Sequence, residues 1–187
     1  MVEVAVETER LRLRTWSDAD KAEFVRVTNR PAVMRWLGGV QSAESMAAGF
    51  ERIDGYQRDF GHTLWAIERK ADRALLGFCG LKRVNSPGAG ALTGDFEIGW
   101  RLREDAWGQG YAKEAAIASL SEAFGVHEAP HVVAFTVHGN LASQGLMKRL
   151  GMIRRDDLDF VDTRFGPELN PSIVYRITAS DWAARQA

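Results

Sequence analysis

Two glycines separated by one residue occur in the segment 107–112, Trp-Gly-Gln-Gly-Tyr-Ala, between a strand-like run and an alanine-rich helical pattern. Glycines at such a junction leave backbone N–H groups facing outward. The N-terminus of the helix behind them adds a partial positive charge. The segment therefore predicts a site for a phosphate or pyrophosphate group and makes a phosphorylated cofactor the first hypothesis.

Three interpretations of this loop compete. A Walker loop requires Gly-Lys-Ser/Thr at its end, and the segment has no such ending. A dinucleotide fingerprint requires a third glycine where Lys113 stands, and an acidic ribose partner after a second parallel strand; neither is evident. The third interpretation is a tight glycine turn without a ligand, and the loop alone leaves it open.

The composition is that of a globular protein without a strong overall field. The chain has 187 residues, 45% of them hydrophobic and 26% charged, and a formal net charge of −1. These values predict one domain with a substantial core and no general nucleic-acid binding. The sequence shows no signal peptide and no apolar run of membrane-spanning length, so we expect a cytoplasmic protein, monomeric or homodimeric, without a membrane partner.

Residues that often bind metals or form disulfides are few and scattered. Cys79 is the single cysteine and is interpreted as a small core residue. The four histidines show no ligand-type pairing, so no metal site is expected. They are His62, His127, His131 and His138.

The hydrophobic pattern predicts alternating strands and helices. Strands are expected over 10–14, 63–68, 75–84, 96–102, 131–137 and 173–178, with another near 152–155. Helices are expected after the capping residue Ser17 and over 42–60, 109–124 and 140–150. This order predicts an α/β sandwich around a mixed, mainly antiparallel sheet of about six to seven strands with about four helices. We expect a single domain over residues 7–179, with terminal extensions at 1–6 and 180–187.

The surroundings of the glycine loop resemble a known family. Residues 8–14 and 96–100, the glycine loop, the Asn-Leu-Ala-Ser at 140–143 and the Leu-Gly-Met at 150–152 together resemble the GNAT acyl-CoA-dependent N-acetyltransferases. The pattern is most similar to the branch of RimJ/RimL-type ribosomal-protein N-terminal acetyltransferases. The resemblance implies a GNAT fold and direct transfer of an acetyl group from acetyl-CoA to a primary amine, on a protein N-terminus or a small molecule. A non-catalytic acyl-CoA-binding sensor of the same fold is the alternative.

The resemblance also implies a set of cofactor contacts. Backbone N–H groups of residues 108–113 would hold the diphosphate of coenzyme A, and the strand before the loop would offer main-chain hydrogen bonds to the acetyl and pantetheine groups. Asn140 would lie beside the pantetheine arm, or would serve only as a helix N-cap. The expected cofactor-binding residues are Trp100, Arg101, Leu102, Trp107, Gly108, Gln109, Gly110, Tyr111, Ala112, Lys113, Asn140 and Ser143.

The chain departs from the family pattern at two positions. Trp107 stands where the loop motif usually has Gln or Arg, and Met147 stands where many members have a tyrosine general acid. A thioether cannot donate a proton. Ser143 is therefore the leading group to donate a hydrogen bond to the departing thiolate; alternatively it serves only the helix N-terminus.

Glu97 is the leading candidate for the catalytic base. It interrupts an apolar strand between Phe96 and Ile98, where partial burial would raise its pKa. The alternative is a strand-edge carboxylate that pairs with an arginine. His138, at the end of a strand, is a candidate secondary proton carrier.

The acceptor side is the least defined part of the sequence. The candidate substrate-binding residues are Trp36, Trp65, Glu97 and Asp157. Asp157 belongs to a loop at 156–165 that carries four aspartates. These carboxylates would attract a cationic amine, or the loop is merely solvated. The sequence does not separate protein N-termini, antibiotics, polyamines and other small amines as acceptors.

Overall fold

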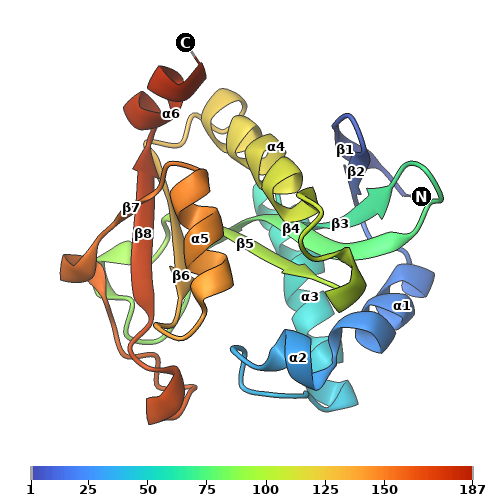
Figure 1. Ribbon diagram of the computed structural model, residues 1–187, viewed down its shortest axis with the longest axis horizontal. Coiled ribbons are helices and arrows are strands. Elements are labelled where there is room, and N and C mark those ends of the chain that lie inside the picture. Colours follow the sequence, from blue (N-terminus) through green and yellow to red (C-terminus); the bar gives the residue numbers. More distant parts are fainter. Residues whose placement is uncertain (1, 187) are drawn as a thin grey trace.

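The computed structural model describes residues 2–186, which form eight strands and six helices (Figure 1). The strands are β1 (Val4–Glu7), β2 (Leu11–Arg14), β3 (Leu64–Arg69), β4 (Leu75–Arg83), β5 (Phe96–Leu102), β6 (His131–Thr136), β7 (Ile153–Arg154) and β8 (Ile173–Thr178). The helices are α1 (Asp18–Thr28), α2 (Pro31–Met34), α3 (Ala43–Phe60), α4 (Tyr111–Gly125), α5 (Leu141–Arg149) and α6 (Ala179–Gln186).

All eight strands belong to one mixed sheet with the order β1-β2-β3-β4-β5-β6-β8-β7. Every neighbouring pair is antiparallel except β5 and β6, which run parallel. This parallel pair is joined only where Phe96 and Glu97 face Val132 and Val133. Beyond those positions the two strands diverge toward their C-terminal ends, as Figure 1 shows. The sheet therefore opens in its middle.

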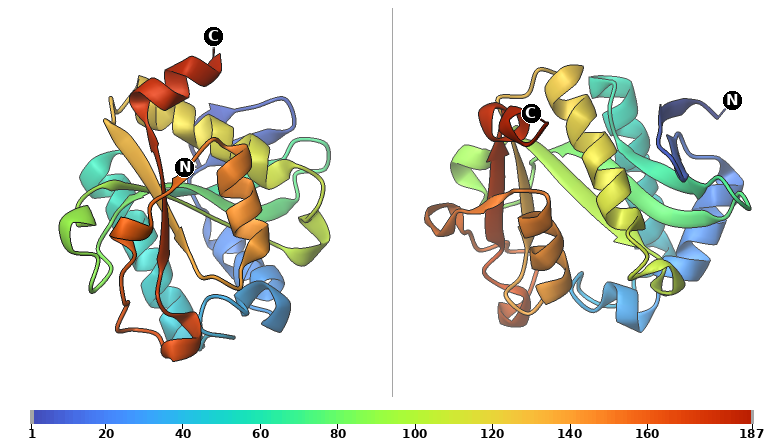
Figure 2. Two further views of the ribbon diagram at one scale, coloured as in Figure 1. Left: turned by 60° about the vertical axis from the view of Figure 1, so that its left-hand side comes forward. Right: turned by 45° about the horizontal axis from the view of Figure 1, so that its top comes forward.

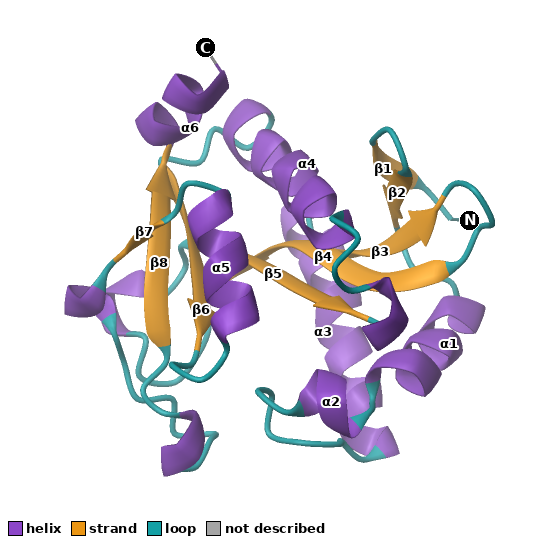
Figure 3. Cartoon of the chain, viewed as in Figure 1, coloured by secondary structure: helices purple, strands orange, loops and turns teal. Residues whose placement is uncertain are grey.

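Helices cover the two faces of the sheet (Figure 2). On one face, α4, α5 and α6 bury apolar side chains in a core with inward-facing residues of the strands, among them Leu11 and Leu13 of β2. On the other face, α1 and α3 pack on β3 and β4 through a cluster that includes Phe24 and Phe50. The long connection between β7 and β8, visible in Figure 3, helps to close the second face of β6 and β8 through Phe160.

The mixed, mainly antiparallel sheet agrees with the sequence prediction, but the number of elements is larger than expected. β1 and α6 lie in the segments that were assigned to terminal extensions. β1 is an exposed edge strand that pairs only with β2, and α6 buries a single residue, Trp182. Each segment is short, so its apolar residues extend over too few positions to show a clear period in the sequence. Within residues 2–186, no helix is long and apolar enough to cross a membrane.

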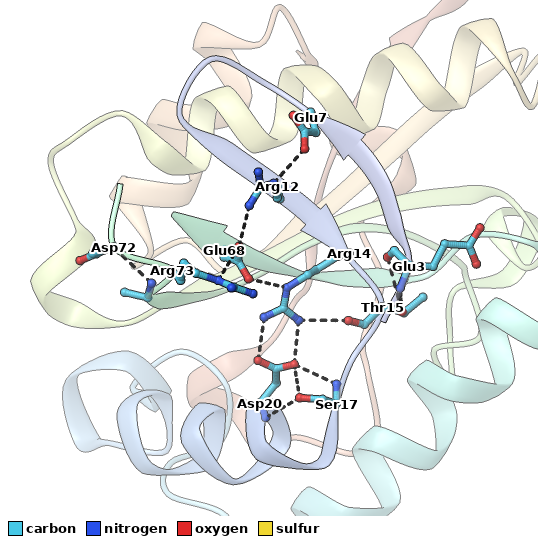
Figure 4. A network of polar contacts seen from close by, with 11 residues as sticks. Glu3, Glu7, Arg12, Arg14, Thr15, Ser17, Asp20, Glu68, Asp72 and Arg73 are labelled. Atoms are coloured by element: carbon cyan, nitrogen blue, oxygen red, sulfur yellow. Dashed lines mark hydrogen bonds and ion pairs between the residues drawn. The ribbon is translucent and has the colours of Figure 1, made fainter. Parts of the chain in front are cut away.

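The expected start of the first helix is confirmed, and its capping residues belong to a buried ionic network (Figure 4). Ser17 and Asp20 form a reciprocal capping box at the start of α1. Asp20 also accepts two hydrogen bonds from the Arg14 guanidinium, at 2.7 and 2.9 Å. The Nε of Arg14 donates to Glu68 on β3 at 2.9 Å. One buried arginine thus ties β2 to both β3 and α1.

Replacing Arg14 with leucine should destabilise the fold strongly. The change leaves the buried carboxylates of Asp20 and Glu68 without their shared cation, which typically costs about 3–5 kcal/mol of unfolding free energy. Chemical denaturation measures this loss. Arg26→Leu is the control, because it breaks the exposed Arg26–Glu23 pair and should cost less than about 1 kcal/mol. Equal effects of the two substitutions would contradict a structural role for the network.

The same network predicts a loss of stability in acid. Burial raises the pKa of Asp20, but hydrogen bonds from Arg14 and Ser17 outweigh burial and lower that pKa from 3.8 to about 2. The folded-state pKa is below the unfolded value, so this stabilisation is present above about pH 4 and disappears as pH falls through about 2. It amounts to about 2 kcal/mol. Urea denaturation between these pH values should show that the unfolding free energy of Asp20→Asn depends less steeply on pH than that of the wild-type protein. An equally steep dependence would exclude Asp20 as the source of the loss in acid.

Candidate functional site

A cavity of about 910 Å³ lies where β5 and β6 diverge. Its walls include Leu64 and Phe78 from the face covered by α1 and α3. They also include Leu146 and Met147 of α5 from the opposite face. The cavity therefore passes through the opening in the sheet, and a ligand held on one face can meet a ligand that enters from the other.

The glycine loop forms one end of this cavity. Gly108 and Gly110 both have positive φ, 71° and 83°, a conformation that L side chains rarely adopt. Gly110 is the N-cap of α4 and has no side-chain hydrogen bond to the helix. The first N–H groups of an α-helix have no partner within the helix. The N-terminus of α4 therefore presents free donors and a partial positive charge, a combination that fits a diphosphate.

Side chains around the loop fix its backbone. The indole Nε1 of Trp107 donates to the carbonyl of Leu102 at 3.0 Å, and Gln109 Nε2 donates to the carbonyl of Asp105 at 2.7 Å. Arg10 donates to the Gln109 carbonyl at 3.0 Å and lies over the Tyr111 ring. Trp107 lines the cavity, whereas Gln109 does not. The tryptophan that replaces Gln or Arg thus links the loop to the end of β5.

Asn140 and Ser143 lie together where α5 begins, on the cavity wall. Asn140 is the N-cap of α5, and its Oδ1 accepts from the backbone N–H of Ser143 at 3.2 Å. Its Nδ2 donates to the Ser143 Oγ at 3.1 Å. The structure shows Asn140 as the N-cap and also places it on the cavity wall, where contact with a pantetheine arm, the other role considered from the sequence, stays a prediction. Because the Ser143 Oγ accepts this bond, its own proton is free to point toward a ligand.

Glu97 is a buried carboxylate on the cavity wall. Its cross-strand neighbour on β4 is Lys82, and the Lys82 ammonium group donates to the Glu97 carboxylate. The expected ion pair therefore involves a lysine rather than an arginine. An ammonium group that enters the cavity would compete with Lys82 for this carboxylate.

The remaining wall comes from α2 and the turn that follows it. Trp36 lines the cavity and packs against Gly139, where a Cβ atom would come within 2.5 Å of the indole ring. The Arg35 guanidinium lies 4.6 Å from the centre of that ring. A side chain at position 139 would therefore force the Trp36 indole to move from its place against the loop that precedes α5.

Comparison with known proteins identifies the architecture around this cavity. The family model of the acetyltransferase (GNAT) domain matches residues 10–153, which is most of the chain. The chain belongs to the GNAT acetyltransferases. The uncharacterized protein YkkB of Bacillus subtilis (strain 168) is 30% identical over 146 residues, which cover 78% of this chain and 83% of YkkB.

Solved structures share the fold over almost the entire chain. An acetyltransferase from Agrobacterium tumefaciens str. C58 superimposes with a TM-score of 0.76 and 27% identity, covering 92% of each chain. The spermidine N-acetyltransferase of Vibrio cholerae, solved with CoA and spermine, gives a TM-score of 0.72 at 16% identity, covering 94% of this chain and 99% of that one. The protein is therefore an acyltransferase with a GNAT fold, and this fold uses acetyl-CoA.

The GNAT domain places most of the predicted site residues on the cavity, with three exceptions. Trp65 is buried in the core beneath α4, because on β3 it points away from its neighbours Leu64 and Ala66, which face α1 and α3. Asp157 lies in a short helical turn outside the cavity and pairs with Arg155 at 2.6 Å. The third exception is Gln109, described above.

The predictions for the histidines and the cysteine have different outcomes. His138 is exposed and lies outside the cavity wall, so the structure does not bring it to Glu97 or Ser143. Among the described residues, no group of histidine, cysteine and acidic side chains could hold a metal ion. Cys79 is fully buried, as expected for a core residue, and burial raises its thiol pKa to about 12.

Sequence reasoning missed four charged side chains on the cavity wall, those of Arg35, Lys82, Arg101 and Arg149. The signal for Arg101 was present, because Glu97 and Arg101 are the two charged residues of an otherwise apolar strand and share one face by its two-residue period. No comparable signal existed for Lys82. Its pairing with Glu97 depends on the register across the loop at 85–94.

Proposed function

We propose that the protein transfers an acetyl group directly from acetyl-CoA to a primary amine, and that its domain belongs to the RimJ/RimL-like branch. The observation that carries this proposal is the single cavity that joins the glycine loop, the opening between β5 and β6, and the Glu97 carboxylate. A diphosphate at the N-terminus of α4 leaves the pantetheine arm free to follow the unpaired edge of β5 toward Glu97.

The co-substrate would be held mainly by backbone groups. The N–H groups of residues 108–113 face the diphosphate, and the main chain of Trp100, Arg101 and Leu102 pairs with the pantetheine and acetyl groups. Asn140 and Ser143 border the arm from α5. Backbone donors at a fixed distance from the thioester oxygen would stabilise the negative charge that develops there.

The reaction requires one proton to leave the amine and one to reach the thiolate. The amine nitrogen bonds to the acetyl carbon while the carbon–sulfur bond breaks, so the amide and free coenzyme A are the products. Glu97 accepts the proton from the amine, directly or through a water molecule. The free proton of Ser143 donates a hydrogen bond to the departing sulfur, which takes its proton from solvent. Trp36 borders the path of the acceptor amine.

Calorimetric titration with acetyl-CoA, followed by a thiol-release assay over a panel of amines and peptides, tests the function itself. Binding followed by release of coenzyme A in the presence of an amine supports acetyl transfer. Binding without turnover on any amine would favour an acyl-CoA sensor, and no binding at all would exclude both functions.

Gly110→Asp should abolish acetyl-CoA binding. The substitution forces a side chain into a left-handed conformation and places a carboxylate beside the expected diphosphate. Gly110→Asn is the matched control, since it has nearly the same shape without the charge. We expect a dissociation constant raised more than about 100-fold for the aspartate, and considerably less for the asparagine. Calorimetry measures the two dissociation constants for acetyl-CoA. An equal loss of affinity in the two variants would exclude an electrostatic role for the loop.

Glu97→Gln should lower turnover while leaving the affinity for acetyl-CoA nearly unchanged. Loss of a general base typically costs about 100-fold or more in rate. The loss should be greater for a lysine-like amine than for an amine of low pKa, because the lysine-like amine must be deprotonated at a larger cost near neutral pH. Asp95→Asn is the control, as that carboxylate pairs with His131 outside the cavity. Unchanged turnover with both kinds of amine would exclude Glu97 as the base.

A further inference from the structure

Arg101 is a cavity-lining cation that forms no ion pair with any of the described residues. Its Nε is buried and has no hydrogen-bond partner within residues 2–186. Burial is the one cause that lowers its pKa, to about 10, since no described carboxylate lies close enough to oppose the effect. Leaving a charged donor unpaired in a protein interior is costly. Such a group is rarely retained without a ligand or a structural partner.

The other deeply placed arginine shows how this fold satisfies such a group internally. Arg14 has two carboxylate partners, Asp20 and Glu68. Arg101 instead lies beside the stacked rings of Phe24 and Phe78, with its guanidinium 5.6 and 5.3 Å from their centres. Aromatic faces attract the positive charge but accept no conventional hydrogen bonds at the guanidinium edge. The rings therefore hold Arg101 in place and leave its donors free.

The position of Arg101 relates it to the proposed chemistry. Alternation along β5 places Glu97, Gly99 and Arg101 on one face of the sheet. Gly99, the middle residue, lines the cavity without a side chain, and a methyl group of Leu64 packs over it. A nitrogen that reacts at the level of Gly99 would be about 7 Å along the strand from each of them. An acceptor molecule would therefore meet a carboxylate on one side and a free guanidinium on the other.

The charged side chains that line the cavity are mostly cations. They comprise a single carboxylate, Glu97, and the five cations Arg35, Lys82, Arg101, Lys113 and Arg149. Glu97 is itself already paired with Lys82. Lys113 is assigned to the co-substrate, whose diphosphate neutralises part of this positive charge. The remaining excess of cations disfavours a polycation and favours an acceptor that carries negative charge.

We propose that the acceptor is an amine that carries its own carboxylate, and that the guanidinium of Arg101 binds this carboxylate beside the reacting nitrogen. The inference rests on the proposed acetyl transfer. It adds a substrate class to that function. The planar guanidinium matches a carboxylate through two parallel hydrogen bonds, a geometry that lysine cannot reproduce.

Matched pairs of acceptors test the proposal. The pairs are glycine and glycinamide, 4-aminobutyrate and 4-aminobutanamide, and 6-aminohexanoate and 6-aminohexanamide, with spermidine as a polycation. The measured quantity is the ratio of kcat/KM for the carboxylate to that for the carboxamide. This ratio does not depend on the fraction of folded enzyme, so partial misfolding of a variant does not affect it. Differences in amine pKa within a pair cancel when variants are compared.

We expect the wild-type enzyme to prefer the carboxylate in at least one pair, and Arg101→Gln to lower that ratio about 10- to 100-fold. Arg101→Lys should restore it in part, because the lysine keeps the charge but loses the paired geometry. Arg103→Gln is the matched control and should leave the ratio unchanged, since Arg103 pairs with Asp105 outside the cavity.

Two results would overturn the inference while leaving acetyl transfer intact. One is a wild-type preference for spermidine or for the carboxamide in every pair. The other is a ratio that Arg101→Gln does not change, which would reduce Arg101 to a residue that packs against Phe24 and Phe78. Failure to bind acetyl-CoA is a separate outcome and would overturn the proposed function itself. Binding of acetyl-CoA without acetylation of any member of this panel would overturn the inference, and turnover on the wider set of amines and peptides then decides the proposed function.

Discussion

Strands β5 and β6 are paired over two residue positions, and then each continues without the other. Backbone N–H and C=O groups inside a protein must find partners, so the inner edge of β5 beyond Glu97 requires something other than a strand. At the far end, the Trp107 indole meets the Leu102 carbonyl. Between these two points an extended ligand can pair with the edge as an added strand would. The interrupted pairing thus creates the cavity and also the backbone groups that suit a pantetheine-like arm.

A sheet that opens in the middle must be held together on both sides. One half is fixed by the contacts of α4 with β4 and β5, and the other by the antiparallel pairing of β6 with β8. The Arg14 network then fixes α1 to β2 and β3. Because α1 carries Phe24, the network also positions the ring that lies against Arg101. A buried structural arginine therefore supports the placement of the unpaired arginine in the cavity.

The sequence was most informative where local chemistry determines structure. The glycine loop, the capping box of Ser17 and Asp20, and the succession of strands could be predicted because each depends on neighbouring residues. Long-range pairing could not be predicted. Trp65 belongs to a strand whose first five residues are all buried, so its pattern does not show which face meets the cavity. The Lys82–Glu97 pair depends on a register set across a loop of about ten residues, which no local signal encodes.

The aspartate-rich loop at 156–165 is another part of the chain whose role could not be predicted from local sequence. From the sequence, its negative charge suggested an attraction for cationic amines. In the structure, Asp157, Asp159 and Asp162 each pair with an arginine in the loop or just before it, so the negative charge is largely neutralised where it stands. Net charge along a segment is therefore a poor guide to the field in a nearby cavity. The field here comes from cations on four separate elements and on the turn after α2, which the fold brings together.

Helices α4 and α5 both begin at the cavity wall, and each N-terminus serves a different step of the proposed reaction. The N-terminus of α4 lies at the glycine loop, and the N-terminus of α5 lies at Asn140 and Ser143. Each helix N-terminus stabilises nearby negative charge. In the proposed reaction, negative charge exists permanently on the diphosphate and develops on the sulfur as the carbon–sulfur bond breaks. The α4 terminus has no side-chain cap and can serve the permanent charge, while the capped α5 terminus holds Ser143 for the transient one. A tyrosine acid at the position of Met147 is then unnecessary, because a thiolate stabilised by a hydroxyl and a helix N-terminus can depart before it is protonated.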